Sequence, residues 1–573
     1  MKPFWTRSWL RVELVLGIVL MALAMMQTGQ MAGAMASNSL STDEFGTIGT
    51  FSSKGPGRVI TDYRAPKNHV FFNLLNSILP GRESLHSARV RLFSILATAA
   101  IPVLLVLFAM ALGRFLEAGV FLALWSLAPQ MLELSMEARG YGFLALFALV
   151  ASIATLGYLR TSHRFFLALI ALSVVLGTYT IPSFLFFGAP LLLLLFLATR
   201  RRETFVAGAI AGGTILLLYS PLLTQLYAAI TEFSDDPDRD FASWHGLVRA
   251  VNLYLFSATF PATLAFIAAL TVTPFALFAI DRRSPDSLAF LLITAASLAT
   301  GAILLLLETP PVRVAAFVTV PFTFAGVFAA GHLIRNFAPL PLRILIVAPL
   351  GYVLVTNAGP ALRAMNFVPA EDWSRAANWI DAAFPPNHPV DFKTRAKYLK
   401  QTLADSKARS AEFDESAFTA GQLVVADARN KWADETHFSR PADEPRVATV
   451  SVPGDIRDVN LTFRLPTDRT ISDVPPELTD GRMDVGVLPA DLTFRASNGH
   501  ALVILFDRPV RQRFAVAHVR DAKTGEKLTE DPGVVHAGNS VAIPIPPRTI
   551  IEAEFELYDP EARIVEAWIS PAE

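Results

Sequence analysis

The sequence predicts an all-α polytopic membrane domain followed by a smaller β-rich domain, and two observations support this. Of the 573 residues, 53% are hydrophobic and only 17% are charged, whereas soluble domains carry about 25% charged residues. The apolar residues form repeated runs of membrane-spanning length that end near residue 357, and the composition beyond is that of a soluble domain. We therefore expect a transmembrane domain over residues 1–360 and a second domain over 361–573.

Net charge and cysteine content exclude several classes of protein. The formal net charge is −1, which excludes a broadly basic nucleic-acid-binding protein, because binding to phosphate backbones needs a clustered cationic surface. The chain has no cysteine, which excludes disulfides, thiolate zinc sites and thiol nucleophiles.

About eleven apolar runs are predicted to span the membrane, since a spanning helix needs ~20 mostly apolar residues. The first, near 10–26, follows three basic residues and resembles a signal anchor or a signal peptide with a small-x-small site at 34–36. We favour the uncleaved anchor, because the run is long and many spans follow. The others are expected near 90–112, 115–131, 141–159, 165–181, 183–199, 204–222, 256–280, 287–306, 314–334 and 341–357.

Arginines on alternate short loops predict the orientation. They are Arg114, Arg160, Arg164, Arg200, Arg201, Arg202, Arg282, Arg283, Arg335 and Arg343. Cytoplasmic loops carry an excess of basic residues, so we expect these loops and the N-terminus in the cytoplasm. An odd number of spans then places 361–573 outside it. We expect a bacterial-type inner membrane protein with an extracytoplasmic C-terminal domain.

Ionisable residues that lie near helix ends are predicted to gather on the outer face. Such groups are costly near membrane depth and mark functional sites, although each could also sit in the interface and reach water. Segment 28–88 belongs to this face and contains two amphipathic pieces, Phe45 to Phe51 and Val70 to Leu79, expected to lie along the membrane surface. The residues on this face are Asp43, Glu44, His69, Glu137, Arg139, Glu308 and Arg313.

Five short motifs follow one another along residues 5–355. They are Asp43-Glu44, Asn68-His69, Arg91-Leu92, Glu137-Ala138-Arg139-Gly140-Tyr141, and Arg313 followed by Pro321. In this order they resemble the motifs of GT-C glycosyltransferases, in particular of the polytopic branch that includes protein O-mannosyltransferases and the lipid A aminoarabinose transferase. The acidic pair and the Glu-Ala-Arg-Gly-Tyr string are the most specific parts.

The resemblance implies an inverting enzyme that transfers a sugar from a polyprenyl phosphate to an envelope acceptor: lipid A, core oligosaccharide, another glycan or a protein. Asp43 matches the catalytic carboxylate and would act as general base, and Glu44 would bind the acceptor or orient Asp43. Arg139 and Arg313 are candidates for holding the lipid phosphate. Guanidinium groups suit a leaving phosphate because they stay protonated and offer a planar fork of donors.

The other predicted substrate-binding residues are His69, Glu137 and Tyr141. Histidine could bind a sugar hydroxyl, the lipid phosphate or a divalent ion, or could simply cap or pack, and Glu137 could orient Arg139 as an ion pair. Carboxylates and histidine suit hard divalent cations, but no spaced ligand motif demands one. The acidic stretch 234–240 is interpreted as an exposed loop because of its proline and mixed charges.

The C-terminal region is predicted to be a helix followed by a β-sandwich-like domain. Ala370 to Phe384 has helical spacing and is followed by two prolines. Short apolar runs then alternate with turns rich in Gly, Pro and Asp, which is typical of a β-rich domain. No set of catalytic residues is recognised in this domain, so we expect it to support the membrane domain or to bind a glycan acceptor. The runs are 423–425, 448–450, 461–463, 502–506, 514–516, 541–543 and 551–557.

Two other functions remain open at this point. A bundle of many helices could be a transporter or a flippase of envelope lipids, although no internal repeat is detected and the charged residues gather at one face. A non-catalytic envelope assembly factor would recruit partners through its outer domain and would tolerate loss of the acidic pair.

Overall fold

The computed structural model divides the chain into two compact units, Met1–Ser37 with Asp43–Phe367, and Asn38–Thr42 with Val368–Glu573. Each unit is considered by itself. The residues described are 5–37, 40–63, 68–81, 86–126, 128–234, 260–306, 316–336, 373–384, 390–392, 424–430, 447–452, 457–464, 493–497, 499–506, 515–528, 535–557 and 564–571.

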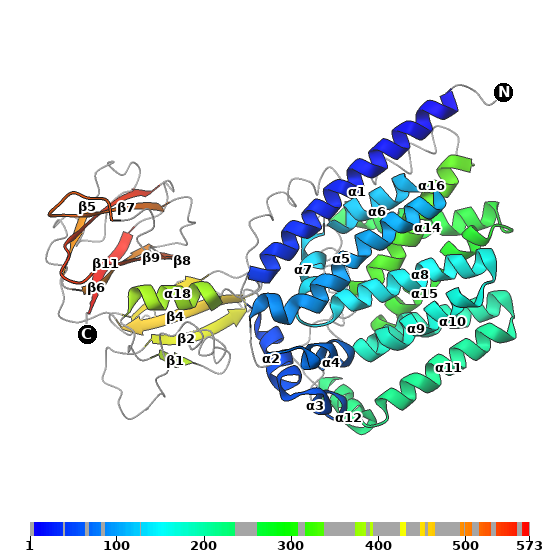
Figure 1. Ribbon diagram of the computed structural model, residues 1–573, viewed down its shortest axis with the longest axis horizontal. Helices are drawn as coiled ribbons and strands as arrows, with labels where there is room; N and C mark the ends of the chain where they lie inside the picture. The colour runs from blue at the N-terminus through cyan, green and yellow to red at the C-terminus, as the bar shows by residue number, and fades with distance from the viewer. Residues whose placement is uncertain are drawn as a thin grey trace. The chain divides into compact units, whose positions relative to one another are not determined.

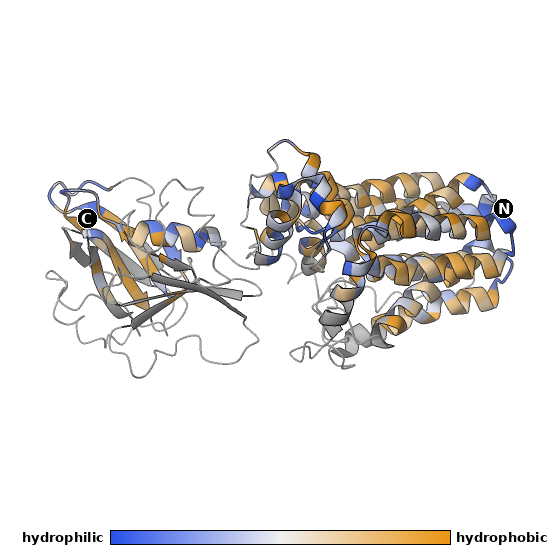
Figure 2. Cartoon of the chain, turned by 90° about the horizontal axis from the view of Figure 1, so that it is seen from below, coloured by the Kyte–Doolittle hydropathy of each residue, from blue (hydrophilic) through white to orange (hydrophobic). Residues whose placement is uncertain are grey.

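The first unit is helical throughout its described residues (Figure 1). Hydrophobic residues run along the lengths of its long helices, and hydrophilic residues gather at their ends (Figure 2). Its helices are α1 (Trp5–Ser37), α2 (Thr42–Thr50), η1 (Ser52–Lys54), α3 (Pro56–Thr61), α4 (Val70–Ile78), α5 (Ser87–Leu112), α6 (Phe115–Ser126), α7 (Pro129–Met136), α8 (Tyr141–Thr161), α9 (Arg164–Thr180), η2 (Pro182–Phe184), α10 (Leu185–Thr199), α11 (Arg202–Tyr219), α12 (Leu223–Ser234), α14 (Phe260–Ile280), α15 (Pro285–Leu306) and α16 (Thr319–Asn336).

Six segments of the described chain are long and apolar enough to cross a membrane, fewer than the eleven predicted. They are Glu13–Ser37, Ser87–Leu112, Tyr141–Thr161, Pro182–Thr199, Pro285–Ile303 and Ala316–Asn336, and shorter apolar helices lie at Phe115–Ser126, Arg164–Thr180 and Phe266–Ile280. The protein is therefore a multi-pass membrane protein by helix length and composition.

Three predicted spans need comment. The span expected at 115–131 is shorter, because α6 ends at Ser126 and Pro129 begins a separate helix, α7. Proline favours the first position of a helix, where its missing N–H has no intrahelical role. The span expected at 204–222 corresponds to α11, which ends at Tyr219. The span expected at 341–357 lies outside the described residues.

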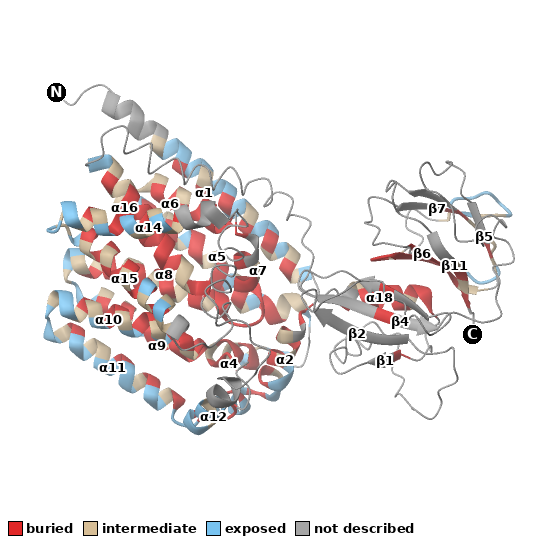
Figure 3. Ribbon diagram, turned by 180° about the vertical axis from the view of Figure 1, so that it is seen from behind, coloured by how far each residue is buried: buried red, intermediate tan, exposed pale blue. Residues whose placement is uncertain are grey.

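Helix α8 is central to the packing of this unit. It contacts α5, α7, α9, α15 and α16, and Figure 3 shows buried residues along α8, α15 and α16 while α11 is largely exposed. Helix α1 packs closely on α6. The approach is so close that a Cβ atom on Gly119 would lie 2.6 Å from the carbonyl oxygen of Gly17. Small residues allow such close approach of two helices in a membrane.

Phenylalanines fill the space between α5, α6, α15 and α16. The rings of Phe324 and Phe328 lie 4.6 Å apart, and Phe108 contacts both at 5.7 and 5.3 Å. Phe121 and Phe290 approach Phe324 at 6.3 and 6.5 Å. Aromatic pairs with these separations add to the energy of burial, and they join helices that are far apart in the sequence.

The second unit contains α18 (Trp373–Ala383), as predicted, and three sheets. All seven predicted runs overlap with observed strands, while β1, β5, β8 and β11 were not predicted. Within the described residues the strand orders are β1-β2-β4-β3, β5-β10-β7 and β11-β6-β9-β8, and every pairing is antiparallel except β1 with β2. The strands are β1 (Val390–Phe392), β2 (Val424–Asn430), β3 (Val447–Val452), β4 (Arg457–Arg464), β5 (Thr493–Ala496), β6 (Gly499–Phe506), β7 (Ala515–Asp521), β8 (Val535–Ala537), β9 (Ser540–Pro544), β10 (Ile551–Leu557) and β11 (Ile564–Pro571).

Helix α18 packs against β4, β6, β8 and β9. Its tryptophans Trp373 and Trp379 are fully buried, and Trp379 contacts the ring of Phe384 at 5.9 Å. The helical spacing predicted for this segment is borne out, and Trp373, Ala377, Ile380 and Phe384, which share that spacing, are all buried. This unit gains its core from α18 and from β6, whose last six residues are all buried.

Candidate active site

The acidic pair lies in the first turn of α2. Asp43 and Glu44 follow Thr42, the first residue of the helix. Negative charge is favoured at this position because the helix dipole presents positive charge at its N-terminus. Two adjacent helical residues point in different directions, so the two carboxylates meet different partners.

Glu44 is completely buried and forms a two-bond ion pair with Arg91 of α5. Arg91 Nε donates to Glu44 Oε1 at 2.7 Å, and Arg91 Nη2 donates to Oε2 at 2.6 Å. The backbone N–H of Ala138 also donates to Glu44 Oε1, at 2.7 Å. Arg91 Nη1 donates in turn to the carbonyl oxygen of Met35, near the end of α1. One carboxylate thus joins α2, α5 and the segment before α8.

Asp43 forms an ion pair with Arg139. Arg139 Nη1 donates to Asp43 Oδ2 at 2.9 Å, and the side chain of Asp43 is 17% exposed while that of Arg139 is 5% exposed. Glu137 Oε2 lies 3.9 Å from the same Nη1 atom. The predicted base and the predicted phosphate ligand are therefore in contact, 96 residues apart in the sequence.

A tight turn presents Arg139. Its backbone N–H donates to the carbonyl oxygen of Glu137 at 2.7 Å, and Gly140 follows with φ of 76°. A Cβ atom on Gly140 would lie 2.8 Å from Thr180 Cγ2 and 3.0 Å from Phe72 Cβ. Glycine is required here twice, because the positive φ disfavours other residues and because no space exists for a side chain.

His69 and Tyr141 lie beside Arg139. The His69 and Tyr141 rings meet edge to face with centroids 5.2 Å apart, and the guanidinium carbon of Arg139 lies 5.2 Å from the centre of the Tyr141 ring. All three residues are buried. An arginine over an aromatic face is held by a cation–π interaction, so Tyr141 supports the position of Arg139.

Buried amides hold the chain next to His69. Asn68 Nδ2 donates to the carbonyl oxygens of Val59 and Asp62 at 2.8 and 2.7 Å, and Asn73 Nδ2 donates to Asn68 Oδ1 at 3.0 Å. Ser52 Oγ donates to Asn73 Oδ1 at 2.8 Å. This chain of hydrogen bonds ties η1, α3 and α4 together, and His69 is the residue that precedes α4.

The charge of Arg139 is secured by its surroundings. Burial alone would lower the pKa of Arg139, but Tyr141, Asp43, Glu137 and Glu44 stabilise its charged form and hold the pKa above its usual value. A cation at this position is matched by carboxylates before any ligand arrives.

The structure brings together most of the predicted site residues. Asp43, Glu44, Glu137 and Arg139, which with Arg91 we call the α2 cluster, are in contact, and His69 and Tyr141 adjoin them. Arg313 and Glu308 lie outside the described residues, as does the acidic stretch after Ser234. Among the described residues no group of three His, Asp or Glu side chains is placed to hold a metal ion.

Arg91 was not predicted as a site residue, although it stood within the resemblance. Its signal was available: an arginine four residues into a helix of the length of a membrane span, where an ionisable residue marks a functional site. Its partner could not be inferred, because Glu44 is 47 residues away in the sequence.

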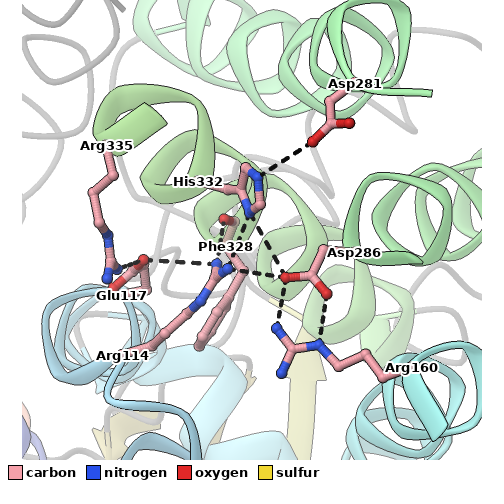
Figure 4. Close-up of polar contacts among 8 residues, drawn as sticks. All are labelled: Arg114, Glu117, Arg160, Asp281, Asp286, Phe328, His332 and Arg335. Carbon is pink, nitrogen blue, oxygen red and sulfur yellow. Dashed lines mark hydrogen bonds and ion pairs between the residues drawn. The ribbon is translucent and has the colours of Figure 1, made fainter. Parts of the chain in front are cut away.

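A second buried polar group, which we call the α15–α16 cluster, joins the alternate loops predicted to be cytoplasmic (Figure 4). Arg160 donates to Asp286 through two bonds of 2.6 Å, and Arg114 donates to Asp286 at 3.0 Å and lies 3.0 Å from His332 Nδ1. The same cluster contains Glu117 paired with Arg335, and Asp281 near His332. The loops before α6 and α15 and the ends of α8 and α16 thus lie together.

Comparison with known proteins gives limited similarity. No protein-family model matches the chain. The type VI secretion system baseplate component TssK1 of Pseudomonas aeruginosa is 30% identical over 107 residues, which is 17% of this chain. The aligned part spans 23% of TssK1.

Two solved structures are similar over most of the chain. Both are crystal structures of ArnT from Cupriavidus metallidurans. The one bound to undecaprenyl phosphate has a TM-score of 0.37 and 12% identity, covering 79% of this chain and 98% of ArnT. The apo structure has a TM-score of 0.38 and 11% identity, covering 80% of this chain and 98% of ArnT.

Proposed function

We propose that the protein is a membrane glycosyltransferase that moves a sugar from a polyprenyl-phosphate donor to an envelope acceptor. The observation that carries this proposal is the contact between Asp43 and Arg139, with Nη1 and Oδ2 2.9 Å apart. A base for the acceptor and a cation for the leaving phosphate then lie side by side. The order of motifs shared with GT-C glycosyltransferases supports the same function.

The reaction is a direct displacement. Asp43 accepts the proton of an acceptor hydroxyl or amine, the acceptor atom bonds to the anomeric carbon, and the bond from that carbon to the phosphate oxygen breaks. The bonding electrons pass to the phosphate, whose negative charge Arg139 stabilises. One displacement inverts the anomeric centre, because retention requires a second carboxylate as nucleophile.

Charge stabilisation and positioning supply the catalysis. The guanidinium group has five N–H donors, and the side chain of Arg139 keeps 5% of its surface exposed beside Asp43, which keeps 17%. Arg139 can therefore contact Asp43 and the donor phosphate together. A preorganised donor of this kind is worth about 3–4 kcal/mol in the transition state.

The remaining assignments follow from this reaction. We place the transfer on the extracytoplasmic side, with residues 1–360 as the catalytic domain and 361–573 as an extracytoplasmic supporting or binding domain. His69 and Tyr141 would contact the donor beside Arg139, and Arg313 would be a second phosphate ligand. The acceptor is lipid A, core oligosaccharide, another glycan or a protein of the envelope.

The variant Asp43→Asn tests the proposal. It removes the base but keeps the shape of the side chain, so transfer of radiolabelled sugar from polyprenyl phosphate to envelope membranes should fall at least about 100-fold. The matched control is Asp62→Asn, which removes another carboxylate paired with an arginine, Arg58, at 2.5 Å. This control should keep transfer.

Full transfer by Asp43→Asn would overturn the assignment of the base. If the wild-type protein translocates the lipid without transferring sugar, the assignment as a glycosyltransferase is refuted and a flippase is favoured. Thermal unfolding of each purified variant shows whether a loss of transfer reflects chemistry or a loss of folded protein.

A further inference from the structure

The two acids of α2 are held differently. Glu44 contacts a side chain of α5 and a backbone N–H, and it is wholly buried, whereas Asp43 contacts the side chain of Arg139 and is partly exposed. A residue with no exposed surface is poorly placed to meet an acceptor. Its contacts instead point to the chain segment that carries Arg139.

Glu44 and Asp43 grip consecutive residues of that segment. Glu44 Oε1 accepts from the N–H of Ala138, and Asp43 Oδ2 accepts from the side chain of Arg139, the next residue. The first contact places the backbone of the turn, and the second orients the guanidinium that the turn presents. Displacement of Ala138 would therefore move Arg139.

Arg91 fixes Glu44 in turn. Its guanidinium donates to both oxygens of Glu44 and to the carbonyl oxygen of Met35. The planar fork of arginine matches a carboxylate with two parallel hydrogen bonds, which fixes direction as well as distance. The chain of contacts runs from the end of α1 through Arg91 and Glu44 to Ala138.

We propose that Glu44 and Arg91 are positioning residues that place Arg139 for binding the donor phosphate. This inference rests on the proposed function and assigns Glu44 to the donor side of the reaction rather than to the acceptor. A displacement of about 1 Å at a reacting group can lower a rate by as much as about 100-fold. Loss of this contact should therefore appear in the use of the donor.

Single substitutions are unsuitable, because removing one partner leaves a buried charge without compensation and strongly destabilises a protein. Two double variants avoid this. Glu44→Gln with Arg91→Gln removes both charges and keeps an oxygen that can accept from Ala138. Glu44→Leu with Arg91→Met removes both charges and also that oxygen. Comparison of the two isolates the hydrogen bond to the turn.

The experiment measures the KM for donor and for acceptor with each double variant in liposomes. The Leu/Met variant should raise the donor KM about tenfold above that of the Gln/Gln variant, which corresponds to the loss of one neutral hydrogen bond. The acceptor KM should stay unchanged. The matched control is Glu117→Gln with Arg335→Gln, which neutralises another ion pair, whose glutamate side chain is 3% exposed and whose arginine side chain is 31% exposed. It should leave both KM values unchanged.

Two results would overturn the inference: equal donor KM values in the two double variants, or a change confined to the acceptor KM. A change confined to the acceptor KM would assign Glu44 to binding of the acceptor. The proposed function fails separately, because it is refuted by a wild-type protein that transfers no sugar from polyprenyl phosphate. Thermal unfolding of the variants confirms that each is folded before its KM values are compared.

Discussion

The α2 cluster and the α15–α16 cluster are both buried groups of arginines and carboxylates, but they differ in how their carboxylates are held. Asp286 receives two bonds from Arg160 and one from Arg114, and its side chain is 8% exposed. Asp43 accepts a hydrogen bond of 2.9 Å from Arg139 and keeps 17% of its side chain exposed.

The difference separates a structural charge from a reactive one. Asp286 is bound by Arg160 of α8 and by Arg114 of the loop before α6, so it joins these two segments and has little capacity left for a substrate. A carboxylate that keeps more of its side chain exposed, as Asp43 does, can reach a substrate and accept its proton. The α2 cluster contains both a structural and a reactive carboxylate. Glu44 is buried like Asp286, although it lies next to Asp43 in the sequence.

The largest effect on stability is expected for substitution of Asp286, and it tests the distinction between the two clusters. Asp286→Asn leaves Arg114 and Arg160 without their shared carboxylate, so it should lower the free energy of unfolding by about 3–5 kcal/mol. The transfer rate per folded molecule should not change. Thermal unfolding in detergent, paired with the transfer assay, measures both quantities.

Asp43→Asn is the reciprocal variant and should lose transfer while it keeps most of its stability, because Glu137 stays 3.9 Å from Arg139 and still compensates the buried charge. If Asp286→Asn abolished transfer in protein that remains folded, the α15–α16 cluster would take part in the reaction. If Asp43→Asn unfolded the protein as severely as Asp286→Asn, the distinction between the clusters would be wrong.

An intermediate effect is expected for the glycines beside the two clusters. Gly140→Ala should cost about 2–4 kcal/mol, because the positive φ disfavours alanine and its Cβ would collide with Thr180 and Phe72. Gly113 precedes Arg114 and also has a positive φ, 66°, but a Cβ atom there meets nothing within 4 Å. Gly113→Ala should therefore cost only about 1–2 kcal/mol.

These two variants also sharpen the functional contrast. Gly140→Ala should reduce use of the donor in the transfer assay, because it displaces the turn that carries Arg139, and Gly113→Ala should not. Equal stability losses measured by thermal unfolding would show that the close packing around Gly140 is unimportant.

The smallest effect is expected at an exposed ion pair near the α15–α16 cluster. Arg164 is 85% exposed and pairs with Glu203 at 3.2 Å. Arg164→Ala should change the free energy of unfolding by about 0–1 kcal/mol, because water screens exposed pairs. Arg160→Ala, four residues earlier and bound to Asp286, is the comparison in the same unfolding measurement and should cost clearly more.

Prediction from the sequence succeeded best for elements with strong periodicity. The apolar runs from 87 to 336 appear as helices, and α18 and the seven predicted strands are present. The strands β1, β5, β8 and β11 were missed. Three of them are three or four residues long, too short for an alternating pattern to stand out.

The candidate site was predictable in part for the same reason. Asp43, His69 and Arg139 were recognised because ionisable residues near helix ends are unusual in an apolar chain. The contacts could not be predicted. Glu44 and Ala138 are 94 residues apart, and nothing in local sequence shows that Asp43 meets the side chain of Arg139 while Glu44 meets Arg91 and the backbone N–H of Ala138.

The sequence by itself determined that this chain has a helical membrane unit and a second unit with strands. Apolar side chains that face lipid or a core recur in the sequence as long runs or at the spacing of a helix or a strand. It also marked the acids and arginines as exceptional. Only the tertiary structure decided which charges meet. The partner of each side chain depends on how α2, α5 and the turn at Gly140 pack together. That packing gives Asp43 and Glu44 different partners.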